Sequence, residues 1–108
     1  MSTILLTGLP ASQGIARGVV RVVTGADDTD RFQEGEILVT RITDPTMVMM
    51  MNCAGAIVTD IGGITSHPAI LSREMGIPCV VNTKNATTLL KEGMMVEVDG
   101  TKGEVRSI

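Results

Sequence analysis

The sequence predicts a single mixed α/β domain, spanning residues 1–108, in which strand outweighs helix. Its length of 108 residues is that of one ordinary domain. Hydrophobic residues make up 44% of the chain, which is enough to bury a core without disulfides or a structural metal. Short segments rich in β-branched residues alternate with brief segments that carry helix start and stop signals. This alternation indicates a compact domain that contains both kinds of element.

Three strands are expected in the first 40 residues, because three segments there are rich in β-branched residues and bounded by Gly or Pro. They are Ile4–Leu6, Ile15–Val23 and Ile37–Thr40. Between the second and third, Asp27, Asp28 and Asp30 are expected to form a loose acidic loop rather than a metal site.

A first helix is expected to begin with Asp44 as its cap and Pro45 in the first helical position, and to end near Gly55. The flexible methionines of residues 47–51 are expected mostly in the core, although such side chains can also form a docking surface. The wholly apolar segment Ala56–Thr59 follows as a strand inside the sheet.

A second helix is expected to begin at about Pro68 and to end at Gly76, because Gly followed by Pro78 is a strong stop signal. The remaining elements are another buried strand, a short helix and a terminal hairpin. They are Cys79–Val81, Asn85–Lys91, and Met94–Val98 paired with Glu104–Ser107.

Charge and hydropathy exclude several classes of protein. The net charge of −3 and the lack of a Lys/Arg cluster argue against a nucleic-acid partner. No apolar run approaches the roughly 18 residues that span a bilayer. The first residues lack the charged and long apolar regions of a signal peptide. We therefore expect a cytoplasmic protein with no nucleic-acid or membrane partner.

The two cysteines, Cys53 and Cys79, belong to no metal-binding motif. Together with a single histidine they cannot supply the four ligands of a structural zinc site. Both are expected to be small buried hydrophobic residues, and no metal site is predicted.

His67 is the only histidine, and it stands between a glycine-containing loop and a helix start. The residue before a proline is disfavoured in helical conformation. We therefore expect His67 at the cap position and Pro68 as the first helical residue. This would place His67 beside the free N–H groups of Ala69 and Ile70, where the helix dipole favours an anion.

The loop before His67 adds features that suit a phosphate. Gly62 and Gly63 let the backbone approach a bound group without a Cβ in the way. The hydroxyls of Thr65 and Ser66 can orient the ring or donate to phosphate oxygens. A nucleophilic histidine must be neutral, with one ring nitrogen bare and the other held. These residues also suit a loop histidine that only satisfies local hydrogen bonds, and they leave both interpretations open.

The twenty residues from Gly62 to Val81 resemble the phosphohistidine signature of the phosphoenolpyruvate-utilising enzymes. This family includes phosphoenolpyruvate synthase, pyruvate phosphate dikinase and enzyme I of the sugar phosphotransferase system. The likeness extends over nearly the whole chain in flanking pieces that would be weak alone. They are Gly8–Gly14 with Ala16 and Gly18, Gly35–Val39, Asp44-Pro45, Gly93 and Val98–Gly100.

The resemblance implies a swivelling β/β/α domain in which His67 is phosphorylated on a ring nitrogen, with Thr65 and Ser66 as neighbours of the phosphate. It implies partners in trans, namely a nucleotide-grasp domain, a barrel domain that handles phosphoenolpyruvate and pyruvate, or both. It implies no cofactor on this domain, whereas magnesium and a nucleotide or phosphoenolpyruvate would bind to the partner domains.

The sequence departs from the family pattern in two residues and in extent. Pro68 stands where the family usually has a small residue and removes one backbone donor from the helix start; Ser72-Arg73 replaces the usual Ala-Arg pair. The grasp domain and the barrel are both missing from the 108 residues. The chain is therefore either a piece of a longer enzyme or a free-standing subunit, and its start and end favour the second.

Other interpretations stay open at this point. Arg73 could reach a phosphate, but it lies about 9 Å along the helix from His67 and off its face, so an ion pair with Asp60 or Asp44 is the alternative. The chain could also be a non-catalytic adaptor of the same fold, or the small subunit of a two-part dehydratase.

Overall fold

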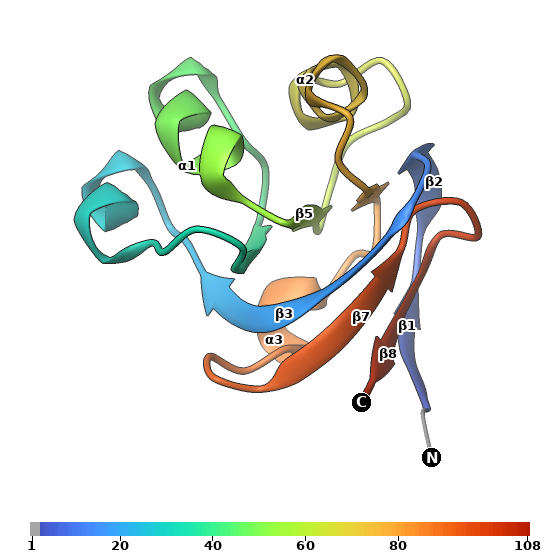
Figure 1. Ribbon diagram of the computed structural model, residues 1–108. Helices are drawn as coiled ribbons and strands as arrows, with labels where there is room; N and C mark the ends of the chain where they lie inside the picture. The colour runs from blue at the N-terminus through green and yellow to red at the C-terminus, as the bar shows by residue number, and fades with distance from the viewer. Residues whose placement is uncertain (1–2) are drawn as a thin grey trace.

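The computed structural model describes residues 3–108, whose eight strands form one curved mixed sheet (Figure 1). The order across the sheet is β1-β8-β7-β3-β4-β5-β6-β2. The middle strands from β3 to β6 run parallel to one another, and the outer neighbours are antiparallel. The strands are β1 (Ile4–Thr7), β2 (Leu9–Ser12), β3 (Ile15–Val22), β4 (Ile37–Thr40), β5 (Ala56–Thr59), β6 (Cys79–Val81), β7 (Met95–Asp99) and β8 (Glu104–Ser107). The predicted mixed α/β class is confirmed.

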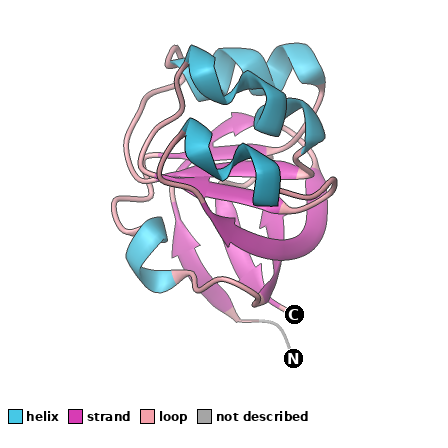
Figure 2. Ribbon diagram, turned by 90° about the vertical axis from the view of Figure 1, so that its left-hand side faces the viewer, coloured by secondary structure: helices cyan, strands magenta, loops and turns pink. Residues whose placement is uncertain are grey.

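Short helices cover both faces of the sheet. α1 and α2 lie on one face and α3 on the other, as the two ribbon views show (Figures 1 and 2). The helices of the described residues are the 3-10 turns η1 (Ala26–Arg31) and η2 (Pro45–Met47) and the α-helices α1 (Val48–Cys53), α2 (His67–Met75) and α3 (Ala86–Leu89).

The central strands are buried on both faces, so successive side chains enter two different cores. In β4, Ile37 and Val39 pack in a cluster with Ala86 of α3. Leu38, between them, packs on the opposite side with Met50 of α1. This explains why β4 and β5 consist of wholly buried residues, as predicted for the second of them.

β1 and β2 are joined by a single residue, Gly8, which carries the chain from one edge of the sheet to the other. The Gly8 N–H donates to the carbonyl of Gly103 at 2.9 Å. A Cβ added to Gly8 would lie 2.4 Å from the carbonyl oxygen of Val81, so only glycine fits at this crossing. The two edges of the sheet are thereby brought together.

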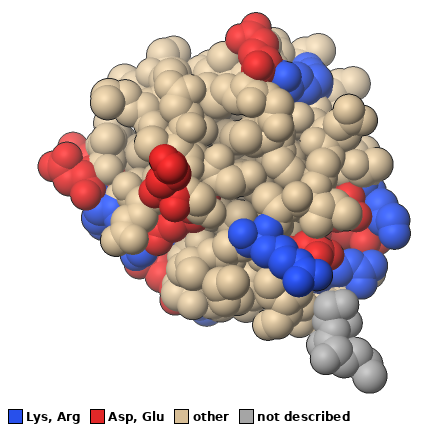
Figure 3. All heavy atoms as spheres, in the orientation of Figure 1, with Lys and Arg blue, Asp and Glu red and all other residues tan. Residues whose placement is uncertain are grey.

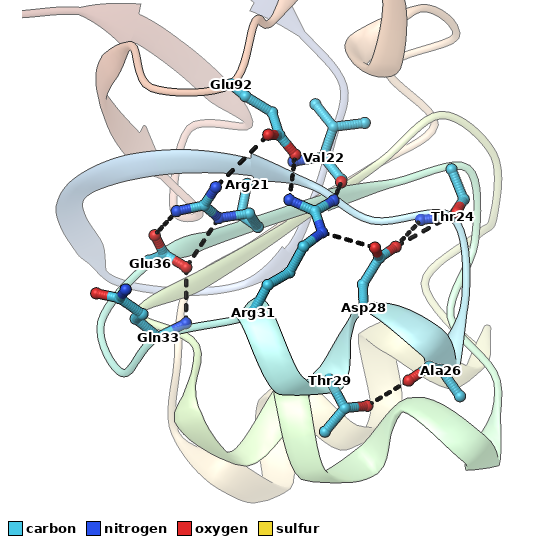
Figure 4. Close-up of polar contacts among 10 residues, drawn as sticks. All are labelled: Arg21, Val22, Thr24, Ala26, Asp28, Thr29, Arg31, Gln33, Glu36 and Glu92. Atoms are coloured by element: carbon cyan, nitrogen blue, oxygen red, sulfur yellow. Dashed lines mark hydrogen bonds and ion pairs between the residues drawn. The ribbon is translucent and has the colours of Figure 1, made fainter.

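A charged network ties η1 to the sheet (Figure 4). Arg21 of β3 pairs with the largely buried Glu36 at 2.5 Å, and Arg31 of η1 pairs with Asp28 at 2.7 Å. Glu92 contacts both arginines. Elsewhere on the face drawn in Figure 3, basic and acidic side chains are interspersed rather than gathered by sign.

Thr3 and Ser107 meet at one end of the domain, where the Ser107 N–H donates to the carbonyl of Thr3 at 2.8 Å. The loop of residues 60–66, which leads into α2, lies at the opposite end in both ribbon views (Figures 1 and 2). The loop and the start of α2 thus lie away from Thr3 and Ser107.

Three expectations about the fold need correction. The strand β2 was not predicted, because Pro10 argues against a strand; it is tolerated in this edge strand, which pairs only with β6. The acidic segment is not a loose loop but the 3-10 helix η1, in which Asp28 pairs with Arg31. Cys53 is exposed at the end of α1, whereas Cys79 is buried as predicted.

Candidate functional site

The candidate site lies at the carboxyl ends of the neighbouring parallel strands β4 and β5, in the middle of the sheet. Because the two strands point the same way, the segments that follow them leave the sheet side by side, which is where ligands bind in many α/β folds. The segment after β4 carries Thr43. The loop of residues 60–66 follows β5 and leads to His67 at the start of α2.

His67 is held by a hydrogen bond at one ring nitrogen. Its Nδ1 lies 2.8 Å from the Oγ1 of Thr43, although the two residues are 24 positions apart. Thr43 is buried, with 3% of its surface exposed, whereas His67 is half-buried and in contact with solvent. In the tautomer with a proton on Nδ1, that N–H donates to the hydroxyl and Nε2 carries a bare lone pair.

Thr43 is the residue that the sequence analysis missed. The predicted ring-orienting hydroxyls, those of Thr65 and Ser66, do not contact His67 in the hydrogen bonds of residues 3–108. No local motif marks Thr43, which stands one residue before the predicted helix cap. Knowing that β4 and β5 are neighbours would have placed the two segments together.

The start of α2 differs from the prediction by one residue. Ser66, with extended backbone at φ −73° and ψ 163°, is the cap, and His67 and Pro68 are the first two helical residues. The expectation that His67 is the cap is therefore wrong. A tight turn explains the difference, since the N–H and the hydroxyl of Ser66 both donate to the carbonyl of Gly63, at 3.1 and 2.6 Å.

The first-turn amides of α2 agree with the prediction only in part. The Ile70 N–H donates to the carbonyl of Ser66 at 3.0 Å, so the expectation that it is free is wrong. The ordinary helical bond from the fourth residue back to the cap accounts for this. Within the described part of the chain no side chain caps α2, and Ala69, the residue before Ile70, is fully buried.

The two glycines of the loop have different roles. Gly62 has a φ of 120°, and an added Cβ would lie 2.9 Å from the Oγ of Ser66 and 3.2 Å from Cδ1 of Ile42. Gly63 has open space where its Cβ would stand, so the fold does not require glycine there. Thr65 is exposed. The second half of the loop therefore leaves open surface beside His67.

The first half of the loop is anchored to the body of the domain. The buried carboxylate of Asp60 accepts from the N–H and the hydroxyl of Thr87, at 2.9 and 2.5 Å. The Ile61 N–H donates to the carbonyl of Arg41 at 3.1 Å. These bonds fix the loop where it leaves β5.

Asp44 is the charged residue next to Thr43. Its carboxylate caps η2 by accepting from the side chain and the N–H of Thr46, which holds the pKa of Asp44 below its usual range, and the nearby His67 adds to this effect. The carboxylate is therefore ionised at neutral pH.

Arg73 donates its hydrogen bonds to the backbone and not to the carboxylates that were expected for it. Its two terminal nitrogens donate to backbone carbonyls, one to Ala11 of β2 at 2.8 Å and one to Ile64 of the loop at 2.5 Å. The expected ion pair with Asp60 or Asp44 is wrong, because those carboxylates are engaged by threonines of their own surroundings.

Ser72, the neighbour of Arg73, is fully buried. Within residues 3–108 its hydroxyl reaches no partner with hydrogen-bond geometry. The Cys79 thiol is close enough for Ser72 to act on its pKa, but a thiol is a weak partner. Burial dominates there and raises the pKa of Cys79 to about 11, so this thiol is unreactive at neutral pH.

Two hollows on the surface lie beside the site and not at it. The larger, of about 890 Å³, runs along β2 and is lined by Arg73; the smaller, of about 390 Å³, is lined by Asp44 and Arg41. His67 is not among the residues that line these two hollows.

Comparison with known proteins places this chain in a family. Residues 32–103 match the family described as PEP-utilising enzyme, mobile domain. The chain belongs to this family. The phosphoenolpyruvate synthase of Pyrococcus furiosus is 59% identical to this mobile domain over 102 residues, which are 94% of the chain and 12% of the relative. The probable phosphoenolpyruvate synthase of Archaeoglobus fulgidus is 57% identical, over 94% of the chain and 14% of the relative.

The mobile domain thus spans about one-eighth of the length of these relatives. Among solved structures, the enzyme I protein studied by NMR is 35% identical, with a TM-score of 0.63 over 72% of this chain and 32% of that one. Aconitase X of Thermococcus kodakaraensis has a TM-score of 0.72 over 95% and 97% of the two chains, but at 23% identity it shares only the fold. No helix within residues 3–108 is long and apolar enough to cross a bilayer.

Proposed function

We propose that this mobile domain is a phosphoryl carrier in which Nε2 of His67 accepts a phosphoryl group and passes it to a second acceptor. The observation that supports this most is the 2.8 Å hydrogen bond between Nδ1 and the hydroxyl of Thr43. It engages one ring nitrogen and leaves the other for chemistry, which is what a nucleophilic imidazole requires.

The accepting step needs only the ring and its hydrogen-bond partner. The lone pair of Nε2 attacks phosphorus, the N–P bond forms, and the bond from phosphorus to the donor oxygen breaks with its electron pair on that oxygen. The Thr43 hydroxyl accepts a hydrogen bond from the Nδ1 N–H during attack, and the proton stays on Nδ1. In the donating step the N–P bond breaks as an acceptor oxygen bonds to phosphorus.

The surroundings of the ring suit an added phosphoryl group. The start of α2 presents the positive end of the helix dipole, which favours negative charge. We assign the phosphate environment to the residues predicted for it. Among them, Thr65 is exposed and Gly63 has open space beside it, so a phosphoryl group can reach both. Gly62 and Ser66 shape the loop, and Ala69 lies in the first turn of α2, whereas the Ile70 N–H is taken up by Ser66.

A phosphoryl carrier needs a donor site and an acceptor site on partner domains. Its match covers about one-eighth of a phosphoenolpyruvate synthase, which supports placing the donor and acceptor sites on other domains. We propose a nucleotide-grasp domain, a phosphoenolpyruvate–pyruvate barrel, or both, working on His67 in trans. Magnesium and a nucleotide or phosphoenolpyruvate would bind there and supply the activated phosphate.

Labelling tests this proposal. The chain is incubated with labelled phosphoenolpyruvate or ATP and the phosphoenolpyruvate synthase of Pyrococcus furiosus, and the short chain is separated from the long enzyme by size. Acid-labile, alkali-stable label on the wild type that is absent from His67→Ala supports the carrier. Label that persists in His67→Ala assigns the site elsewhere, and a wild type that no donor labels favours the adaptor or the dehydratase subunit.

A further inference from the structure

Arg73 connects three parts of the domain that surround the candidate site. The residue itself lies on the second turn of α2, six positions after His67. One terminal nitrogen donates to the carbonyl of Ala11 in β2 and the other to the carbonyl of Ile64 in the loop. A single guanidinium thereby joins helix, sheet edge and loop.

The bond to Ile64 acts on the part of the loop that has few other anchors. The first half is fixed by Asp60 and by the bond from Ile61 to Arg41. After Gly62, the loop turns back on itself through the bonds of Ser66 to Gly63, which are internal to it. The guanidinium is thus the side chain that ties this second half to the sheet.

We propose that Arg73 is a positioning residue, which clamps the loop of residues 60–66 to β2 and so fixes the surroundings in which His67 carries its phosphoryl group. This rests on the proposed function. The clamp depends on the two-pronged shape of the guanidinium, because the two carbonyls belong to different segments. A lysine keeps the positive charge but offers one compact ammonium, so it does not bridge them in the same way.

The clamp also bears on the ring nitrogen that reacts. His67 follows the loop directly, and its Nδ1 is covered by Thr43 only while the start of α2 is held in place. If the loop loosens, the ring gains freedom to turn Nδ1 outward. Phosphorylation would then lose its selectivity for Nε2 as well as its rate.

The experiment compares Arg73→Lys with the wild-type chain, using potassium phosphoramidate as a small phosphoryl donor that needs no partner domain. Hydrogen exchange of the Ser66 amide reports on the loop, and the Ile61 amide serves as an internal reference. We expect the Ser66 amide of Arg73→Lys to exchange about 10- to 150-fold faster, which corresponds to losing one hydrogen bond to a charged group, whereas the Ile61 amide should change little. ³¹P NMR should show slower phosphorylation and the appearance of the Nδ1 isomer.

Two controls separate positioning from general destabilisation. Arg106→Lys alters an arginine that pairs with Glu104 on β8, and should leave the exchange and the isomer ratio as in the wild type. Ile57→Val lowers the stability of the core and should also leave the isomer ratio unchanged. Arg73→Gln is measured alongside, and a variant that destabilises the fold too far is measured at a lower temperature against Ile57→Val at equal stability.

The outcomes distinguish this inference from the proposed function. A wild type that phosphoramidate modifies at His67, together with an Arg73→Lys that behaves identically in exchange, rate and isomer ratio, overturns the clamp alone. If Arg73→Lys behaves like the wild type while Arg73→Gln loses exchange protection, rate and isomer selectivity, the role belongs to the positive charge, and this also overturns the clamp. A wild type that is never modified at His67 overturns the proposed function and the clamp with it.

Discussion

Replacing Thr43 with valine tests how the ring is made ready for transfer. Valine has nearly the shape of threonine, so the buried position stays filled, but it can neither accept from nor donate to Nδ1. A neutral hydrogen bond of this kind contributes about 0.5–1.5 kcal/mol net. At about 1.4 kcal/mol for each factor of ten, its loss should reduce the population of the reactive tautomer, and the rate, by about two- to ten-fold.

The assay is phosphorylation of His67 by phosphoramidate, followed by ³¹P NMR at neutral pH. Thr43→Ser is the matched control, because it keeps the hydroxyl and removes one methyl group; its rate should stay within about two-fold of the wild type. We also expect Thr43→Val to admit some Nδ1 phosphorylation, since that nitrogen is no longer covered. Equal rates and the same single isomer in wild type and Thr43→Val would refute this reasoning.

Three further predictions concern the fold around the site. Ser72→Ala removes a buried hydroxyl that lacks a partner with hydrogen-bond geometry, so the protein should become more stable. The melting temperature should rise by about 4–8 °C for each 1 kcal/mol of unfolding free energy gained. A fall in the melting temperature would mean that the hydroxyl is hydrogen-bonded. Gly62→Ala should lower the unfolding free energy by about 1–3 kcal/mol, because φ is 120° there and the Cβ would collide with its neighbours. Gly63→Ala, whose Cβ would stand in open space, should unfold like the wild type. Similar urea midpoints for the two variants would contradict this. The Arg21 side chain lowers the pKa of Glu36, so this pair adds stability above about pH 4.5 that is lost as pH falls through the lowered pKa. In urea unfolding between pH 6 and pH 3, the unfolding free energy of Glu36→Gln should therefore fall less than that of the wild type. An identical fall in both proteins would rule out a contribution from the pair.

The regular elements were predictable where local signals are strong. The buried strands β5 and β6 and the Gly76 stop of α2 follow from apolar runs and turn residues, and the structure confirms them. β2 was missed because Pro10 contradicts a strand locally and only its place at the sheet edge permits one. η1 was missed because its order comes from an ion-pair network that joins distant segments.

The site was predictable in position but not in its contacts. The sequence near His67 indicates a helix start after a glycine loop, and that is where the structure places the residue. The partner of its ring, Thr43, depends on which strands are neighbours. The role of Arg73 depends on two carbonyls, of which that of Ala11 is 62 positions away in the chain. Neither contact has a sequence pattern, because backbone acceptors and strand order leave no mark on residue identity.

The central claim, that Nε2 of His67 carries the phosphoryl group while Thr43 engages Nδ1, is tested most directly by NMR of the phosphorylated chain with ¹⁵N-labelled histidine. The account predicts that phosphorylation shifts the Nε2 resonance and places phosphorus on that nitrogen alone. Phosphorus bonded to Nδ1, or a modified chain in which the histidine resonances are unchanged, would contradict it.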